Sequence, residues 1–450
     1  MVFRFHLFLN LILNHYMQKV FLSALVLLGS VAPALAQDSP VRFNPTRVSE
    51  TASNSTRRVC GTMEVLAAQL AADPAQAQRM AAIETQTRQL LANSALNRTT
   101  AGTVIIPVVV HVLYNTAAQN ISDAQAQSQI AVMNEDYQKL NTDASKTPSI
   151  YAGLAANSGV QFVLAKRDPN GLATTGIIHK YTKTTSWSTN DAVKNSKRGG
   201  DNPWDASKYL NMWACNLGQG LLGYAQFPGG SAATDGVVIL YSAFGSRAKY
   251  AAGTYITTYD LGRTATHEVG HWLNLRHIWG DDNGACTGSD LVDDTPNQGA
   301  ENYGCPVFPH VSCSNSGDMS MNYMDYTDDQ CMYMFSTGQS TRMNALFGPG
   351  GVRVSLLTST GGTAPRTAMV AGTAVSFYPN PTSSVLTLGL PAGVDAARYT
   401  VRVYDLRGRE MSSVSYDGHG QVQVNALPKG LYYMSISNGL ITSRQRFEKE

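Results

Sequence analysis

The segment Thr264–Trp279, TATHEVGHWLNLRHIW, carries the residue types and spacing best suited to chemistry in this chain. His267 and His271 are four residues apart, so one helical turn places both imidazoles on the same face, with Glu268 beside them. His277 follows six residues after His271. Three imidazoles that can reach one ion predict a metal site, and zinc is a metal that such ligands commonly bind.

A straight helix cannot present all three histidines to one ion, so we expect the helix to end after His271. Asn274 is well placed to end it, because asparagine adopts the left-handed conformation more readily than most residues. Three protein ligands leave a fourth position for water, as in catalytic zinc sites, whereas structural sites are closed by four protein ligands. We therefore predict peptide hydrolysis through a zinc-bound water, with Glu268 as the general base.

The same residues resemble the signature of the metzincin clan of zinc peptidases, HExxHxxGxxH followed by a methionine turn, with Asn274 in place of the glycine. Downstream, MNYMDYTDDQC resembles the methionine turn of the pappalysin family, in particular its secreted, ulilysin-like microbial members. This resemblance implies that Met324 packs beneath the zinc-binding histidines. It also implies that Tyr326 stabilises the oxyanion of the tetrahedral intermediate, the alternative being a turn aromatic with a satisfied hydroxyl.

The resemblance further implies that Asp329 lies at the base of the S1′ pocket, which predicts cleavage before Arg or Lys. Asp328 and Asp329 could equally be solvated acids of a turn. The segment Leu221–Gly230 resembles the family's edge strand above the cleft. There Gly223, Tyr224 and Ala225 would hold an extended peptide by main-chain hydrogen bonds, the alternative being a surface hairpin.

Four of the six cysteines surround this segment and allow three pairings, which the sequence alone does not distinguish. The resemblance implies the pairs Cys286–Cys313 and Cys305–Cys331. Cys60, in RRVCGT, resembles the cysteine switch of pappalysin-type proenzymes, in which a thiolate takes the open zinc position and keeps the enzyme latent. An ordinary free thiol is the alternative for Cys60, and a buried free thiol is preferred for Cys215.

The segment GSDLVDDTP groups the oxygen donors of Asp290, Asp294 and Thr295. Oxygen ligands at this density can hold calcium, and the resemblance implies structural calcium in this region. Asx turns or a helix cap explain the same residues nearly as well. The expected cofactors are therefore catalytic Zn²⁺ and structural Ca²⁺.

The elements around the motif predict an α/β (α+β) domain of the metzincin type over residues 103–355, with a mixed sheet, an active-site helix and a loop-rich C-terminal subdomain. The β-branched run 103–114 predicts a buried strand, in which Pro107 requires an edge or a bulge. Ser122 begins a helix with the stripe Ile130, Met133, Tyr137 and Leu140. Further strands are expected at Val160–Lys166, Leu210–Cys215, Leu222–Phe227 and Gly236–Tyr241.

The N-terminus has the pattern of a secretory signal peptide over residues 1–36, with the true start at Met1 or Met17. A membrane anchor is the weaker interpretation of the extra apolar stretch at residues 1–16, and no stable membrane insertion of the mature protein is expected. Residues 37–102 have too few large apolar residues for a core of their own. They predict a helical pro-segment that lies on a neighbour, with Asp73 as the N-cap of one helix.

Beyond a Gly-, Thr- and Ala-rich linker at residues 356–374, short alternating segments over residues 375–450 predict a β-sandwich. YPNP, VYDLRG, LPKGLYY and RFEK resemble the sorting domain of the type IX secretion system, the alternative being a binding module. A net charge of +2 gives no footprint for nucleic acid. The sequence thus predicts a secreted or cell-surface zinc endopeptidase acting on peptides and proteins, the alternative being an adhesion protein with a vestigial zinc site.

Overall fold

The structure, a computed structural model, describes residues 57–92, 103–282, 284–365, 375–390, 395–438 and 442–450. The predicted signal peptide and the first part of the predicted pro-segment lie outside these residues. Within the described ranges, no helix is long and apolar enough to cross a membrane.

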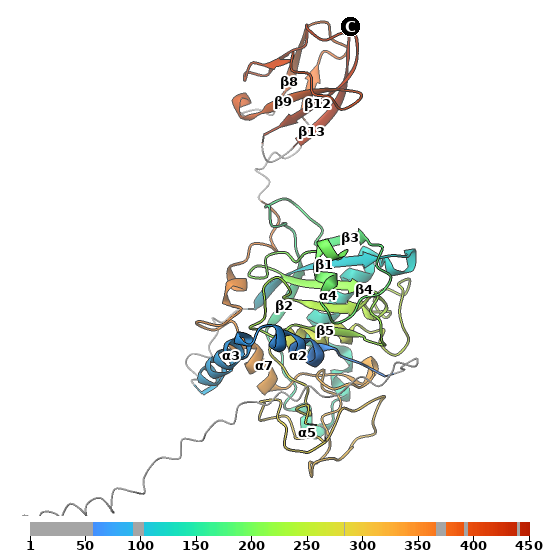
Figure 1. Cartoon of the computed structure of the whole chain (residues 1–450), viewed down its shortest axis with the longest axis vertical. Coiled ribbons are helices and arrows are strands. Elements are labelled where there is room, and N and C mark those ends of the chain that lie inside the picture. The colour runs from blue at the N-terminus through green and yellow to red at the C-terminus, as the bar shows by residue number, and fades with distance from the viewer. Residues whose placement is uncertain (1–56, 93–102, 283, 366–374, 391–394, 439–441) are drawn as a thin grey trace, which may run out of the picture. The chain divides into compact units, whose positions relative to one another are not determined.

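A six-stranded mixed sheet forms the centre of residues 103–365 (Figure 1). Its strands are β1 (Val104–Tyr114), β2 (Val160–Leu164), β3 (Ile177–Tyr181), β4 (Leu210–Cys215), β5 (Gly223–Ala225) and β6 (Val237–Leu240). Their order is β2-β1-β4-β6-β5, with β3 also paired to β1, and every pair is parallel except β5 with β6. The antiparallel strand β5 therefore forms one end of the sheet.

The valine-rich strand β1 is internal to the sheet, and nearly all of its side chains are buried. Such a run is typical of a parallel strand covered on both faces. Pro107, expected at an edge or a bulge, lies on a part of β1 that has a neighbouring strand on one side only, which confirms the expectation for this residue. Pairing with β2 covers Val104–Val108 and pairing with β4 begins only at Val108, so Pro107 lies where β2 alone pairs with β1.

Two helices cover one face of this sheet. The helix α4 (Asp123–Tyr137) contacts β2, α6 (Arg263–Trp272) contacts β5 and β6, and the two helices contact each other. Ser122 caps α4 as predicted, because its Oγ accepts the N–H of Gln125. Leu140, expected in the apolar stripe, lies beyond the end of α4 and is exposed.

Residues 273–336 form the expected loop-rich subdomain after α6, and α7 (Thr337–Ala345) follows them. Two disulfides tie its loops together, Cys286–Cys313 and Cys305–Cys331, with Cα–Cα distances of 5.4 and 5.6 Å. This confirms the pairing that the family resemblance implied. The remaining short helices are α5 (Ser149–Ala152) and 3-10 turns at Ala117–Gln119, Thr142–Lys146, Ala192–Lys194, Ser196–Arg198, Tyr241–Ala243, Asp329–Cys331, Val354–Thr358 and Ala396–Arg398.

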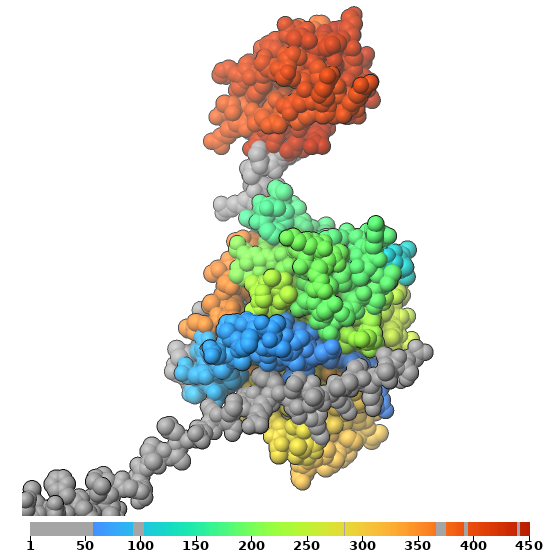
Figure 2. Space-filling model, viewed as in Figure 1, coloured from blue at the N-terminus to red at the C-terminus, as the bar shows by residue number. Residues whose placement is uncertain are grey.

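The described part of the predicted pro-segment contains α2 (Thr62–Ala72) and α3 (Ala75–Ala92), blue in Figures 1 and 2. Asp73 caps α3 as predicted, since its Oδ1 accepts the N–H of Ala75. The helices share no core of their own. Instead α2 packs against β5, α3 packs against α7, and Val65, Leu66 and Leu90 are buried in these contacts.

Residues 375–450 form two antiparallel sheets with a separate core, which confirms the predicted β-sandwich. One sheet has the order β10-β11-β8-β7 and the other β13-β12-β9. The strands are β7 (Ser376–Tyr378), β8 (Val385–Gly389), β9 (Thr400–Asp405), β10 (Ser415–Tyr416), β11 (Gln421–Gln423), β12 (Gly430–Ser437) and β13 (Thr442–Lys449).

The first part of the predicted linker belongs to the large domain by its hydrogen bonds. The N–H groups of Lys166 and Arg167 both donate to the carbonyl of Gly361, and the hydroxyl of Ser359 donates to the carbonyl of Lys208. The large domain therefore continues past residue 355, as far as the described chain reaches at residue 365.

Candidate active site

The three histidines of the motif come together in the interior of the large domain. His267 and His271 lie on the buried helix α6, which ends at Trp272. Asn274 has a φ of 71°, the left-handed turn that the sequence predicted. This turn brings His277 back toward the helix, so that His271 Nε2 lies 3.1 Å from His267 Nε2 and 3.1 Å from His277 Nε2.

Each imidazole is oriented by a hydrogen bond at its other ring nitrogen. The Nδ1 atoms of His267 and His271 donate to the carbonyls of Tyr323 and Leu275, at 2.7 and 2.8 Å. His277 Nδ1 lies 2.8 Å from Asp281 Oδ1. These acceptors hold a proton on Nδ1 of each ring, so the three Nε2 atoms face one another as potential metal ligands.

The lone pairs of facing Nε2 atoms repel one another unless a cation lies among them. Their separation fits a tetrahedral zinc site, in which nitrogens about 2.0–2.1 Å from the metal lie about 3.3 Å apart. Burial, followed by the neighbouring imidazoles, lowers the pKa of His267 and His271 well below the usual range, which keeps both rings in the neutral form that binds metal. The residues present therefore fit zinc.

Cys60 of the pro-segment is the fourth residue of this group. Within the described chain, Cys60, His267, His271 and His277 are the one cluster of potential metal ligands, with ligand atoms within 4.8 Å of one another. The Cys60 thiol also donates to Glu268 Oε2 at 3.4 Å. Cys215, in contrast, is a buried free cysteine on β4, as predicted.

Glu268 lies next to the histidine cluster and is itself fully buried. Burial raises the pKa of Glu268 to about 7, although hydrogen bonds from Thr62 and Cys60 oppose the shift. Thr62 Oγ1 donates to Glu268 Oε2 at 2.9 Å and accepts the N–H of Ala225 at 2.8 Å. A pro-segment hydroxyl thus bridges the carboxylate and the edge strand β5.

The methionine-turn residues lie where the resemblance implied. Met324 is buried against Gly270, on the turn of α6 between the two histidines. The hydroxyl of Tyr326 lies 3.2 Å from His277 Nε2, and its ring packs edge-on against the ring of His277. The phenol of Tyr326 therefore points at the metal site.

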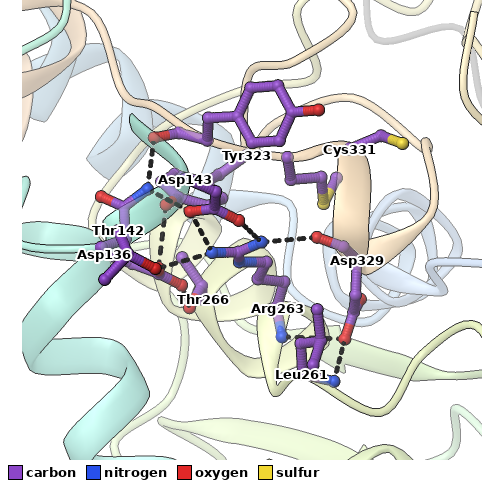
Figure 3. Close-up of polar contacts among 12 residues, drawn as sticks. Asp136, Thr142, Asp143, Leu261, Arg263, Thr266, Tyr323, Asp329 and Cys331 are labelled. Carbon is purple, nitrogen blue, oxygen red and sulfur yellow. Dashed lines mark hydrogen bonds and ion pairs between the residues drawn. The ribbon is translucent and has the colours of Figure 1, made fainter. Parts of the chain in front are cut away.

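Asp329 is fully buried, not solvated. Its Oδ2 accepts the backbone N–H groups of Leu261 and Arg263, and its carbonyl accepts from the Arg263 guanidinium (Figure 3). The same guanidinium forms a two-point contact with Asp143. Arg263 thereby fixes the position of Asp329 and leaves Oδ1 free for another partner.

That partner is Arg58 of the pro-segment, whose side chain is 1% exposed. Its Nη2 lies 2.7 Å from Asp329 Oδ1, its Nη1 donates to Thr264 Oγ1, and its Nε donates to the carbonyl of Thr327. Its guanidinium also lies over the ring of Tyr259, 5.1 Å from the centroid. The Arg58 guanidinium is therefore surrounded by hydrogen-bond acceptors and by the face of an aromatic ring.

The pro-segment adds a short strand to the edge of β5 beside the site. The N–H of Leu222 donates to the carbonyl of Val59, and the N–H of Gly61 donates to the carbonyl of Gly223. Cys60 and Gly223 form a parallel bridge. A Cβ at Gly61 would lie 2.9 Å from Thr189 Cγ2, so glycine permits this close approach. The Tyr224 side chain is buried, so β5 offers mainly its backbone to the cleft.

The oxygen atoms of the predicted calcium group point to different partners. Asp290 accepts from the Thr295 hydroxyl, and burial raises the pKa of Asp290 to about 7. Asp294 accepts from the hydroxyl of Ser336 and the N–H of Gly338 at the start of α7. These contacts match the turn and helix-cap alternative, and calcium binding here stays a prediction.

Sequence reasoning missed three residues of the site, Arg58, Thr62 and Asp281. Arg58 and Thr62 flank Cys60 at two residues on either side, so their placement follows once Cys60 is at the metal site. Asp281 follows His277 by four residues, and a carboxylate that orients a metal-binding imidazole is common. A carboxylate four residues after His277 was therefore the signal from which Asp281 could have been predicted.

A three-histidine site with an adjacent buried glutamate, set on a mixed α/β fold, defines the metzincin type of metallopeptidase. In comparisons with known families, residues 191–347 match Peptidase M43, described as pregnancy-associated plasma protein-A, and residues 376–449 match the secretion system C-terminal sorting domain. An extracellular metalloprotease of Pyricularia oryzae is 35% identical over 269 residues, which are 57% of this chain and 80% of the relative. One from Arthroderma benhamiae is 34% identical over 246 residues, covering 54% and 77%.

Two solved structures from Tannerella forsythia resemble this chain. Mature mirolysin in complex with a cleaved peptide is 53% identical, with a TM-score of 0.55, covering 57% of this chain and 97% of that one. A promirolysin mutant is 48% identical, with a TM-score of 0.60, covering 67% and 97%. The chain belongs to the pappalysin (M43) family of metallopeptidases, and its C-terminal type IX sorting domain marks it as a secreted or cell-surface protein.

Proposed function

We propose that this chain is a zinc endopeptidase that uses Glu268 as its general base, cleaves before basic residues and is made as a cysteine-switched zymogen. The observation that carries the proposal is the cluster of Cys60 with His267, His271 and His277 beside the Glu268 carboxylate. The sorting domain supports export through the type IX machinery as the route to its peptide and protein substrates.

The mechanism follows from what each side chain can do. His267, His271 and His277 would hold zinc, which would lower the pKa of water toward about 7 and polarise a carbonyl oxygen. Glu268, which follows His267 directly on α6, takes a proton from the attacking water and gives it to the leaving amine. The Tyr326 hydroxyl donates a hydrogen bond to the oxyanion as negative charge develops.

Latency follows from the same geometry. The Cys60 thiol occupies the open side of the histidine cluster, and the strand formed by Val59–Gly61 covers the β5 edge that a substrate backbone would use. Thr62 engages the general base directly. The pro-segment thus takes the metal position, the base and the backbone site together.

The pocket around Arg58 supports cleavage before Arg or Lys. Arg58 places its guanidinium against Asp329 only two residues before the cysteine at the metal site. A buried carboxylate needs a cationic partner, because an unpaired buried charge is strongly unfavourable. When the pro-segment leaves, a basic side chain of a substrate can replace Arg58 at Asp329.

The direct test replaces Glu268 with Ala and measures casein hydrolysis and bound zinc on the activated protein. We expect activity to fall by a factor of about 10²–10⁴ or more while zinc remains bound, since removal of a general base leaves the ligands intact. A chelator should abolish the wild-type activity. Undiminished hydrolysis by Glu268→Ala would overturn the mechanism, and no hydrolysis by the wild type would favour the adhesion alternative with its vestigial site.

A further inference from the structure

The helix α3 lies away from the zinc site and has its own set of contacts with the large domain. Its axis runs beside α7 (Figure 1), and the pair Glu84–Arg342 lies between the two helices. Arg342 Nη1 donates to Glu84 Oε1 at 2.8 Å, and Arg342 Nη2 donates to Glu84 Oε2 at 2.5 Å. The Arg342 side chain is 1% exposed, so this two-point contact is almost completely shielded from water.

Weaker contacts surround this ion pair along the helix. Arg79 Nε donates to the carbonyl of Gly229, and the amide of Gln86 donates to the carbonyl of Pro349. Leu90 is buried against Gly348. The partners of α3 therefore span two separate segments of the large domain, the loop after β5 and the end of α7.

Arg342 also supports the turn that carries the zinc-binding residues. Its Nε donates to the carbonyl of Asn274 at 2.8 Å, at the residue where the chain reverses after α6. The next carbonyl, of Leu275, accepts from His271 Nδ1. The guanidinium that Glu84 neutralises thus lies directly behind a turn that orients a metal ligand.

We propose that the surface beneath α3, centred on Arg342, is a docking site that binds a carboxylate-bearing helix separately from the zinc site, and that the pro-segment is its occupant. The three guanidinium nitrogens of Arg342 have different partners. Nε donates to the carbonyl of Asn274, in the turn after α6, and Nη1 and Nη2 donate to the carboxylate of Glu84 on α3. Release of Cys60 alone then leaves α3 bound. This regulation rests on the proposed function, because it concerns the release of the same zymogen.

The test measures backbone hydrogen exchange on the full chain, with Glu268→Gln in every sample so that no self-cleavage occurs. Glu84→Gln keeps the shape of the side chain and removes its charge. Glu64→Gln is the matched control, because Glu64 is an exposed acid of α2 that accepts a hydrogen bond from the hydroxyl of Thr189. Both variants change the net charge equally, and neither residue belongs to the large domain, so Arg342 and the core remain intact.

We expect Glu84→Gln to raise exchange in α3 at least about tenfold over Glu64→Gln, since breaking one partner of a buried pair is costly. Cys60→Ser should raise exchange around residues 59–61 and leave α3 protected. Equal exchange of α3 in the two glutamine variants would overturn the proposal, and so would loss of α3 protection in Cys60→Ser. Because the readout needs no hydrolysis, failure of the proposed activity would not alter this result.

A second measurement uses a chain that keeps Glu268 and carries Cys60→Ala, so that the thiol no longer contributes to latency. Adding Glu84→Gln should shorten the time to the mature form severalfold beyond Cys60→Ala alone, whereas Glu64→Gln should not. The mature enzymes should share the same kcat/KM, because the substituted helix is absent from them. An unchanged maturation time would count against a separate docking site.

Discussion

At the scale of single residues, two side chains of the predicted pro-segment contact the proposed general base and the proposed metal ligands. Cys60 Sγ lies at the histidine cluster and donates to Glu268, and Thr62 Oγ1 donates to the same carboxylate oxygen. A buried carboxylate that accepts two such donors is held away from any water molecule it would deprotonate. If Glu268 is the general base, as proposed, the thiol and the hydroxyl both oppose its action.

We predict that Cys60→Ala shortens the latent period of the zymogen strongly, and that Thr62→Val shortens it by a smaller factor. Valine matches threonine in shape but loses the hydroxyl that bridges Glu268 and Ala225. Thr62→Ser, which keeps the hydroxyl, is the control and should stay close to the wild type. Gel analysis of maturation over time is the measurement, and a latent period unchanged by Cys60→Ala would contradict the cysteine switch.

At the scale of elements, α6 and the segments after it position the site through one buried arginine. Arg263 is the first residue of α6. Its guanidinium contacts Asp143, in the 3-10 turn Thr142–Lys146, and donates to the carbonyl of Asp329 (Figure 3). Arg263 thereby joins the helix that carries His267 and His271 to Asp329, the residue proposed to bind the basic side chain of a substrate. Because its side chain is 7% exposed, water cannot replace these partners easily.

Replacing Arg263 with Leu should therefore destabilise the protein by about 3–5 kcal/mol, the usual cost of stranding the partners of a buried charge. The matched control is Arg247→Leu, which removes a half-exposed pair with Asp260 and should cost less than about 1 kcal/mol. Urea unfolding of the inactive chain with Glu268→Ala measures both. Equal losses for the two variants would show that the Arg263 network does not hold the pocket.

Much of this arrangement was predictable because it depends on local spacing. The helical spacing of His267 and His271, the left-handed residue Asn274 and the cap at Ser122 all follow from backbone geometry over a few residues. The strand β3 was missed, because its residues Ile177–Tyr181 are partly exposed and carry no clear alternation. The edge position of Pro107 was predictable, because proline has no backbone N–H to donate to a second neighbouring strand.

The contacts of the pro-segment were beyond sequence reasoning for a different reason. Arg58 with Asp329 and Glu84 with Arg342 join residues more than 250 positions apart, at separations of 271 and 258. No periodicity or spacing rule specifies such pairs. The disulfides were predictable only in part. Four cysteines left three pairings open, and only the family resemblance distinguished between them.

At the scale of the whole molecule, the chain combines an enzyme domain with a sorting domain for export and with a segment proposed to keep the enzyme latent. The sandwich at residues 375–450 has a hydrophobic core separate from that of the large domain. The pro-segment has no such core and is held by the large domain. The sandwich thus has a core of its own, whereas the helices of the pro-segment bury their apolar residues against the large domain.

Deletion of residues 375–450 should leave the kcat/KM of the activated enzyme within about twofold of the full chain, because the two cores share no residue. The same deletion should stop export through the type IX route. Activity assays on purified protein and fractionation of the producing cells test the two halves of this prediction. Export of the truncated chain at the normal level would contradict the role of the sorting domain.

The most direct test of the whole account is a mass-spectrometric cleavage profile of the activated enzyme on a peptide library, run beside Asp329→Asn. We predict cleavage before Arg or Lys for the wild type, suppression of all cleavage by a chelator, and a loss of at least about tenfold in kcat/KM for basic P1′ residues in Asp329→Asn. Cleavage without a basic P1′ residue, or a profile unchanged in Asp329→Asn, would contradict it.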